Sequence, residues 1–164
     1  MSIDPGAFVH PLAVVLGDVT LGARVSIWPT AVVRADSDAI VVGAESNVQD
    51  GAVLHTDPGL PMRIGARVAI GHRAIVHGAT VEDDVLIGMG AILLNGSRIG
   101  RGSLVAAGAV VREGMQVPPH SLVVGVPGRI VRETTEAERA RIARTVAAYL
   151  ALQERHRAGE FARR

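Results

Sequence analysis

The chain has 164 residues, a formal net charge of +1 and only 2% aromatic residues, so it is long enough for one domain whose core is filled by Val, Ile, Leu and Ala. It contains no cysteine and no lysine, which excludes disulfides, thiol nucleophiles, cysteine-ligated metals and lysine-based chemistry. Its basic residues form no stripe interleaved with aromatic residues, so we expect no binding of nucleic acid.

The N-terminal segment and the apolar runs bear on location. Residues 1–5 carry neither a charged start nor an apolar stretch of the kind found in signal peptides. No apolar run is long enough to span a membrane. We therefore expect a cytoplasmic protein that does not associate with membranes and acts on a small molecule.

Aliphatic residues recur every six positions from residue 9 onward. In chain order they are Val9, Val15, Leu21, Ile27 and Val33; Val42, Val48 and Leu54; Ile64, Ile70 and Val76; and Val81, Ile87, Leu93, Ile99, Val105, Val111, Val117 and Val123. This period is typical of a hexapeptide β-helix, in which each short strand is one side of a triangular coil. Glycine often follows the aliphatic residue, where we expect it to relieve strain at the corner.

The repeat predicts an all-β solenoid, a parallel β-helix domain at residues 1–134 with roughly six coils stacked about 4.8 Å apart. The register slips within residues 33–42, 54–64 and 76–81. Polar residues gather around these slips, namely Arg34, Asp36, Gln49, Asp50, His55, His72 and His77. Insertions in solenoids often lie on the binding face, so we expect the functional site here.

Counting sides of the prism places these polar residues in two columns. Because three hexapeptide steps return to the same side one coil higher, Arg34, His55 and His77 stack in one column. Asp50 and His72 stack in a second column on the preceding side, so one chain directs His72 away from the His55–His77 pair. We expect a homotrimer in which His55 and His77 of one chain and His72 of the next bind a metal, with Arg34 facing Asp50 across the interface.

Simpler roles remain open for several of these residues. The three histidines could form an interfacial hydrogen-bond cluster without a metal, and Gln49 could be a surface amide. The Arg34–Asp50 pair is expected to fix the register between subunits rather than to take part in catalysis. The remaining histidines, His10, His120 and His156, are expected to be solvated or hydrogen-bonded.

The chain changes character after Pro127. Thr135 and Glu138 form a predicted capping box, with Thr135 as the N-cap of a helix. Mostly apolar residues follow at helical spacing, namely Ile142, Val146, Tyr149, Leu150 and Gln153. The sequence therefore predicts one amphipathic C-terminal α-helix at residues 135–157, packed along the prism, and a tail at residues 158–164.

From about residue 8 to residue 157 the chain resembles the gamma-class carbonic anhydrase family. The matching segments are Arg34-Ala-Asp36, Asn47-Val-Gln-Asp50, Leu54-His55, Ile70-Gly-His72, Val76-His77-Gly78 and Ile87-Gly-Met-Gly90. The resemblance implies left-handed coiling, although parallel crossovers are normally right-handed. It implies that His55, His72 and His77 bind zinc, iron or cobalt between the subunits of a trimer. It also implies an intersubunit ion pair between Arg34 and Asp50, and an active site lined by Asp36 and Gln49.

The activity implied by this resemblance is the reversible hydration of CO2 to bicarbonate. Three neutral imidazoles leave a coordination position open to water, and the metal makes hydroxide available near neutral pH, as it does in carbonic anhydrases. Gln49 would orient this hydroxide toward CO2. Well-known family members also have a proton-exporting glutamate on an acidic loop, whereas Ser37 follows Asp36 here and the loop at residues 56–63 has no glutamate. We therefore expect low turnover unless buffer accepts the proton.

Two further functions stay open. Residues 121–127 resemble the last coil of hexapeptide acyltransferases, so acyl transfer or acyl-CoA thioester hydrolysis on the same scaffold is one alternative. A non-enzymatic assembly subunit is the other. An acyltransferase needs one histidine base and a pantetheine slot, so three convergent histidines argue against the first alternative, and the intact ligand set argues against the second.

Overall fold

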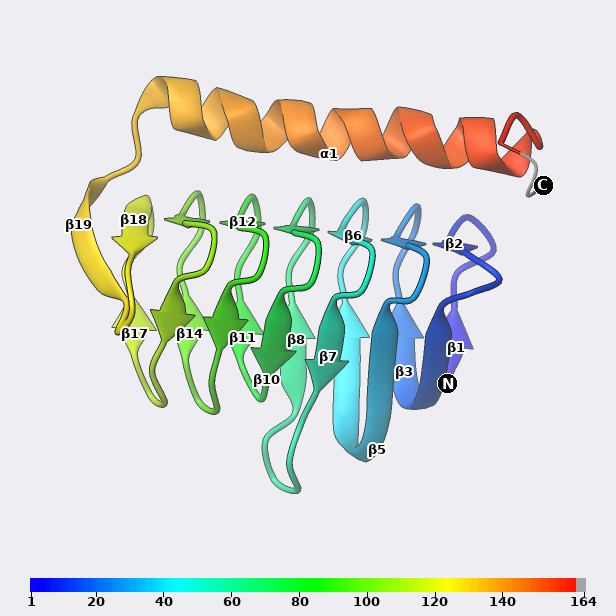
Figure 1. Ribbon diagram of the computed structural model, residues 1–164. Coiled ribbons are helices and arrows are strands. Elements are labelled where there is room, and N and C mark those ends of the chain that lie inside the picture. Colours follow the sequence, from blue (N-terminus) through cyan, green and yellow to red (C-terminus); the bar gives the residue numbers. More distant parts are fainter. Residues whose placement is uncertain (162–164) are drawn as a thin grey trace.

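The structure is a computed structural model that describes residues 1–161, a left-handed parallel β-helix of about 7 turns with one C-terminal helix (Figure 1). The hexapeptide β-helix predicted from the sequence is thus confirmed. The additional turn arises at the N-terminus, where β1 (Ser2–Ile3) pairs with residues 20–21 ahead of the first residue of the six-residue repeat. The predicted tail at 158–164 lies partly outside the described residues.

The first of the three faces of the prism is an 8-stranded sheet. Its parallel strands are β2 (Phe8–Val9), β4 (Ser26–Ile27), β6 (Asn47–Val48), β9 (Ala69–Ile70), β12 (Leu86–Ile87), β15 (Leu104–Val105) and β18 (Ser121–Val124). The strand β19 (Arg129–Glu133) pairs antiparallel with β18 and leads into α1 (Glu136–Arg157). The helix runs back along this face, from the last coil to the first (Figure 1).

The second and third faces belong to one 11-stranded sheet, because β3 (Val14–Leu21) and β5 (Val32–Val42) run round the corner between them. The second face continues through β7 (Val53–His55), β10 (Ile75–His77), β13 (Ile92–Leu93) and β16 (Val110–Val111). The third face contains β1, β8 (Met62–Ile64), β11 (Thr80–Val81), β14 (Arg98–Ile99) and β17 (Gln116–Val117).

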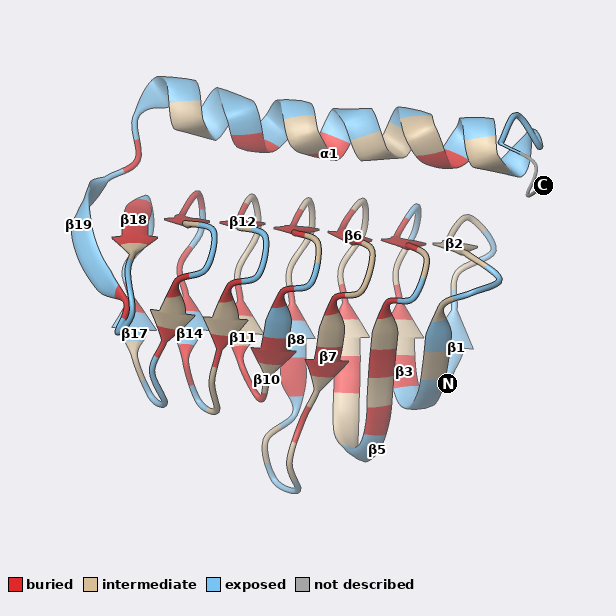
Figure 2. Cartoon of the chain, viewed as in Figure 1, coloured by how far each residue is buried: buried red, intermediate tan, exposed pale blue. Residues whose placement is uncertain are grey.

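The aliphatic residues of the six-residue repeat fill the prism. Those from Leu21 to Val123 are all buried, whereas Val9 and Val15 in the first coils are only partly covered (Figure 2). One corner is filled by a column of alanines that the period did not predict, namely Ala31, Ala52, Ala74, Ala91 and Ala109. Each buried Val, Leu or Ile contributes about 1.5–3 kcal/mol of transfer free energy, so the repeat is the main stabilising element.

The glycines after the inward aliphatic residues have a different role from the predicted relief of strain. Gly43 and Gly71 do not have a positive φ. A Cβ added at Gly43 would lie 2.6 Å from the backbone of Gly65, and one at Gly71 would lie 2.7 Å from the backbone nitrogen of Met89. These glycines therefore allow neighbouring coils to approach closely. At the corner between the third and first faces, positive φ angles fall on Arg24, Glu45, Arg67, Asp84, Gly102 and His120.

The helix α1 begins after Thr135, as the capping box predicted. The Thr135 hydroxyl accepts a hydrogen bond from the backbone N–H of Glu138 at 3.2 Å, and the Glu138 carboxylate accepts one from the backbone N–H of Thr135 at 2.7 Å. Ile142 and Val146 are buried against the first face. At the other end, Arg157 donates to the carbonyl oxygen of Gly6 at 2.7 Å, which ties the helix to the first coil. Within residues 1–161 no helix is long and apolar enough to cross a membrane.

Candidate metal centre

Arg34, His55 and His77 lie in one column on the second face. Strand pairing sets Arg34 opposite His55 and His55 opposite His77 in successive coils. Each residue follows an inward aliphatic residue, so its side chain points out of the prism. His55 Nδ1 lies 3.0 Å from His77 Nε2, which brings the two imidazoles into contact.

Asn95, from the next coil, orients His77. Its amide nitrogen donates to the Asp57 carboxylate at 2.8 Å, because a carboxylate can only accept. The amide oxygen therefore faces His77 Nδ1, at 2.7 Å, and accepts its proton. Nε2 of His77 is then unprotonated, so its lone pair, which faces His55 Nδ1, can bind a metal. Neither Asn95 nor Asp57 was among the predicted site residues, although Asn95 lies two positions after Leu93, which stacks on Val76.

A group that could hold a metal ion lies in this region. Within residues 1–161, the ligand atoms of His55, Asp57 and His77 lie within 4.8 Å of one another. Imidazole and carboxylate are ligands that suit zinc and iron, so the donor set fits such an ion. His72 is not part of this group, so a single chain brings together two of the three predicted histidines and adds a carboxylate.

Arg34 pairs with Asp36 within the chain. Its Nη1 lies 2.9 and 2.7 Å from the two carboxylate oxygens of Asp36. The same carboxylate lies 3.2 Å from His55 Nε2. The hydrogen bond from Arg34 is the largest cause of a lowered pKa of Asp36, and His55 contributes as well. Asp36 thus stays ionised beside the histidine pair.

Asp50 and His72 form the second column, which follows strands of the first face. An oxygen of Asp50 lies 3.0 Å from Nδ1 of His72. The hydroxyl of Tyr149 on α1 lies 3.3 Å from Nε2 of the same ring. Burial, and to a smaller extent the negative charge of Asp50, raises the pKa of Tyr149 to about 12. The phenol therefore keeps its proton. Asp50 therefore accepts the Nδ1 proton of His72, and the lone pair on Nε2 of His72 faces the Tyr149 hydroxyl.

Gln49 lies beside His72 rather than beside His55 and His77 of its own chain. It is 4% exposed, and its amide nitrogen donates to Oδ1 of Asn47 at 3.0 Å. Gln49, His72 and Tyr149 line a groove of about 370 Å³ between α1 and the corner after the first face. The groove continues along the prism past Met89 and Ala106 to Arg141.

An apolar row runs next to the histidine column on the outside of the second face. Its members stack in register as Val14, Val32, Val53, Ile75, Ile92 and Val110. Val14 and Ile75 are 45% and 39% exposed. The corresponding row on the third face is largely polar, and the row on the first face is covered by α1. The second face is thus the one with uncovered apolar surface next to the histidines.

Comparisons with known proteins agree on the hexapeptide-repeat fold. Residues 78–113 match the family "Bacterial transferase hexapeptide (six repeats)". A protein described as "Probable carbonic anhydrase" from Methanocaldococcus jannaschii is 48% identical over 142 residues, which cover 87% of this chain and 89% of that protein. "Gamma carbonic anhydrase 1, mitochondrial" of Arabidopsis thaliana is 40% identical over 162 residues, 95% of this chain but 59% of that protein.

Other relatives carry different descriptions. The "Carnitine operon protein CaiE" of Escherichia coli (strain K12) is 40% identical over 136 residues, 83% of this chain and 69% of that protein. Among solved structures, a hexapeptide transferase family protein from Anaplasma phagocytophilum superposes with a TM-score of 0.90 at 36% identity, covering 93% of this chain and 90% of that chain. The same scaffold thus occurs in proteins described as anhydrases and as transferases.

Proposed function

Because the chain belongs to the gamma-class carbonic anhydrase family of hexapeptide-repeat proteins, we propose that it is a homotrimeric metalloenzyme that hydrates CO2 reversibly. His55 and His77 of one subunit and His72 of the next are the proposed ligands of a divalent metal. Zinc is the first choice for three imidazoles, and iron or cobalt suits the same donor set.

The observation that carries this proposal is the distribution of the histidines over two columns. His55 and His77 are in contact at 3.0 Å, and because Asn95 holds the Nδ1 proton of His77, its Nε2 is unprotonated. His72 follows a different face, and because Asp50 holds the Nδ1 proton, Nε2 of His72 is unprotonated and faces Tyr149. Two half-sites of this kind on separate edges become one site when neighbouring subunits meet around a threefold axis.

The trimer is supported by the apolar row beside the histidine column. This row of Val and Ile is partly exposed along the second face, and it loses contact with water when a neighbouring subunit covers it. Three of its members, Val32, Val53 and Ile75, lie two residues before Arg34, His55 and His77. Association through this row therefore brings His72 of the neighbouring subunit close to the His55–His77 pair. In the trimer, Arg34 turns from Asp36 to the neighbour's Asp50 as an ion pair that sets the register.

The residues around the metal have separate roles in this proposal. When bound, the metal supplies a Lewis acid that activates water near neutral pH. Gln49 uses its amide nitrogen on Asn47, so its amide oxygen is available to orient that water toward CO2. Asp36, 3.2 Å from His55 Nε2, contributes negative charge beside that ring. Asp57 is the acidic side chain nearest to His77 on the loop at residues 56–63.

The test combines metal analysis with a direct assay. Anaerobically purified protein should contain one metal ion per chain, and metal-loaded protein should accelerate CO2 hydration in stopped-flow measurements. His77→Ala should lose both properties, whereas His120→Ala, which removes a histidine far from the site, should retain both. Fully loaded protein that shows no CO2 hydration at any pH or buffer strength would reject the anhydrase while leaving the metal-binding trimer in place.

Acyl transfer or thioester hydrolysis is the second candidate, because the groove beside His72 is larger than CO2 requires. Its wall of Gly88, Ala106 and Ala107 leaves room for an extended chain that ends near Arg141. His72, held by Asp50, would act as the base in this case. Turnover of acyl-CoA by the metal-free protein, together with its loss in His72→Ala, would support this function over the anhydrase.

A further inference from the structure

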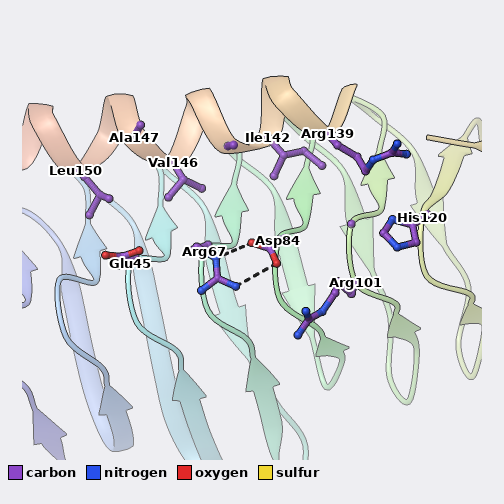
Figure 3. A pocket seen from close by; sticks show the side chains of 12 residues that line it. Glu45, Arg67, Asp84, Arg101, His120, Arg139, Ile142, Val146, Ala147 and Leu150 are labelled. Atoms are coloured by element: carbon purple, nitrogen blue, oxygen red, sulfur yellow. Dashed lines mark hydrogen bonds and ion pairs between the residues drawn. The ribbon is translucent and has the colours of Figure 1, made fainter. Parts of the chain in front are cut away.

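A second hollow lies along the opposite edge of α1 from His72. It has a volume of about 460 Å³ and is bounded by α1 and by the corner between the third and first faces (Figure 3). On the prism it is lined by Glu45, Arg67, Asp84, Arg101, Gly102 and His120. The proposed metal ligands take no part in it, so its function is separate from the metal centre.

The helix supplies an apolar wall for this cavity. The wall consists of Ile142, Val146 and Leu150, with Ala143 and Ala147 beside them. The three larger residues are four positions apart, so they form a continuous strip along one side of the helix. From Ile142 to Leu150 the strip is about 12 Å long, roughly the length of a ten-carbon alkyl chain.

The charges that line the cavity are balanced at one end and not at the other. Glu45 is paired with Arg24 at 3.0 Å, and Asp84 with Arg67 at 2.6 Å, so both carboxylates have an arginine partner. At the other end lie Arg101, Arg139 and His120 (Figure 3).

The basic end retains free donors. Arg101 shares one carboxylate, that of Asp83, with Arg67. Arg139 donates to the backbone carbonyl of Thr134 and, like His120, has no carboxylate within ion-pair distance in residues 1–161. A guanidinium has five N–H donors, so both arginines keep donors for a further acceptor.

From this combination we infer that the cavity binds a linear alkyl carboxylate of medium chain length. The carboxylate lies at the end that holds Arg101, Arg139 and His120, where a guanidinium offers a fork of N–H donors that matches its two oxygens. The alkyl chain lies against Ile142, Val146 and Leu150. Each methylene that enters the apolar strip strengthens binding about three- to fourfold, until the chain reaches the carboxylate of Glu45 at the far end.

The first test compares three ten-carbon ligands by isothermal titration calorimetry on the full-length, assembled protein, below their micelle concentrations. Decanoate should bind, while decanol, which lacks the charge, should bind about tenfold more weakly. Decyltrimethylammonium should bind no better than decanol. Equal affinity for the cation and the carboxylate, or no binding of decanoate, would overturn the inference.

The second test locates the site with paired variants. Ala143→Trp fills the cavity from an exposed helix position and should abolish decanoate binding, whereas Ala148→Trp, on the outer side of the same helix, should not. Arg101→Ala should weaken binding, whereas Arg98→Ala, an exposed arginine outside the cavity, should leave it unchanged. His72→Ala should bind decanoate as the wild type does. Loss of binding in His72→Ala with retention in Ala143→Trp would move the ligand to the groove beside His72 and refute the assignment.

Discussion

The side chains of Asp50 and His72 lie 3.0 Å apart on the edge that follows the first face, whereas His55 and His77 lie 3.0 Å apart on the edge that follows the second face. Both pairs span the same two adjacent coils, but they lie on different edges of the triangular prism and therefore point in different directions. A site that uses all three histidines therefore needs two subunits.

Mixing two inactive variants should regenerate metal sites. His55→Ala and His72→Ala subunits each lack one ligand, but a mixed trimer can place an intact His55–His77 pair beside an intact His72. Random mixing in a cyclic trimer restores about one site in four, which should appear as bound metal and recovered activity after subunit exchange. Mixing His55→Ala with His77→Ala is the matched control and should restore nothing, because both changes affect the same half-site. A monomer that binds one metal per chain in sedimentation experiments would contradict shared sites.

Arg34→Ala should weaken the trimer more than it changes the subunit fold. Within one chain the Arg34 side chain is 42% exposed, so its pair with Asp36 is a solvent-screened surface pair that contributes little to folding. Across a buried interface, removal of one partner costs on the order of 3–5 kcal/mol, because it leaves an uncompensated charge. The trimer dissociation constant from analytical ultracentrifugation should therefore rise, while Arg63→Ala, an exposed arginine on the third face, should leave it unchanged. An unaltered dissociation constant for Arg34→Ala would count against the intersubunit pair.

The two histidine columns could be predicted from the sequence because a six-residue period fixes which side of the prism each residue occupies. Strand pairing sets His77 opposite His55 and Ile70 opposite Val48, as the count required. Asp57 could not be found in this way, since it lies on an insertion where the period gives no register. The six-residue period does give the position of Asn95 on the prism. Its role in orienting His77 depends on the direction of its side-chain amide, which the period does not give.

For the helix, too, the sequence pattern predicted some features and not others. The capping box and the apolar stripe predicted where α1 begins and which residues it buries. They did not predict which face of the prism it covers, because this depends on the outward residues of the strands, such as Leu86 and Leu104. The contact between Tyr149 and His72 follows from that choice of face.

Asn95→Ala should lower metal affinity without unfolding the protein. The amide oxygen fixes the Nδ1 proton of His77, so its loss lets the ring turn or change tautomer. Removing such a partner of a metal-bound histidine typically costs 10–100-fold in metal affinity, about 1.4–2.7 kcal/mol. Competition with a chelator would measure the loss, and an unchanged melting temperature of the metal-free protein would show that the fold is intact. Wild-type affinity in Asn95→Ala would exclude the orienting role.

A glutamate introduced at Pro58 should raise CO2 turnover at low buffer concentration. The loop lacks the glutamate of well-known family members, so proton export should otherwise depend steeply on buffer, with Asp57 as the one nearby acid on the loop. Pro58 is exposed and tolerates a side chain, whereas Gly59 has φ +79° and donates its N–H to Asp38 at 2.9 Å. Gly59→Glu should therefore be less stable by about 1–2 kcal/mol and serve as the contrast. Equal buffer dependence in Pro58→Glu and wild type would argue against a missing proton carrier.

Acid should destabilise the start of α1 through Glu138. Its hydrogen bonds from Arg132 and then from the backbone N–H of Thr135 lower its pKa from 4.5 to about 2 in the folded chain. A carboxyl whose folded pKa is depressed adds stability that is fully present above its unfolded pKa of 4.5 and is lost as pH falls toward 2.

Urea denaturation at fixed protein concentration should therefore show a steeper loss of stability between pH 4.5 and 2 for the wild type than for Glu138→Gln. The control is Glu136→Gln, which removes another acid from the first turn of the helix but not from the capping box. It should keep the wild-type slope in this range. Thr135→Ala, which removes the other half of the box, should lower stability by about 1 kcal/mol at neutral pH. Parallel pH profiles for wild type and Glu138→Gln would mean that the Glu138 contacts are already lost in solution.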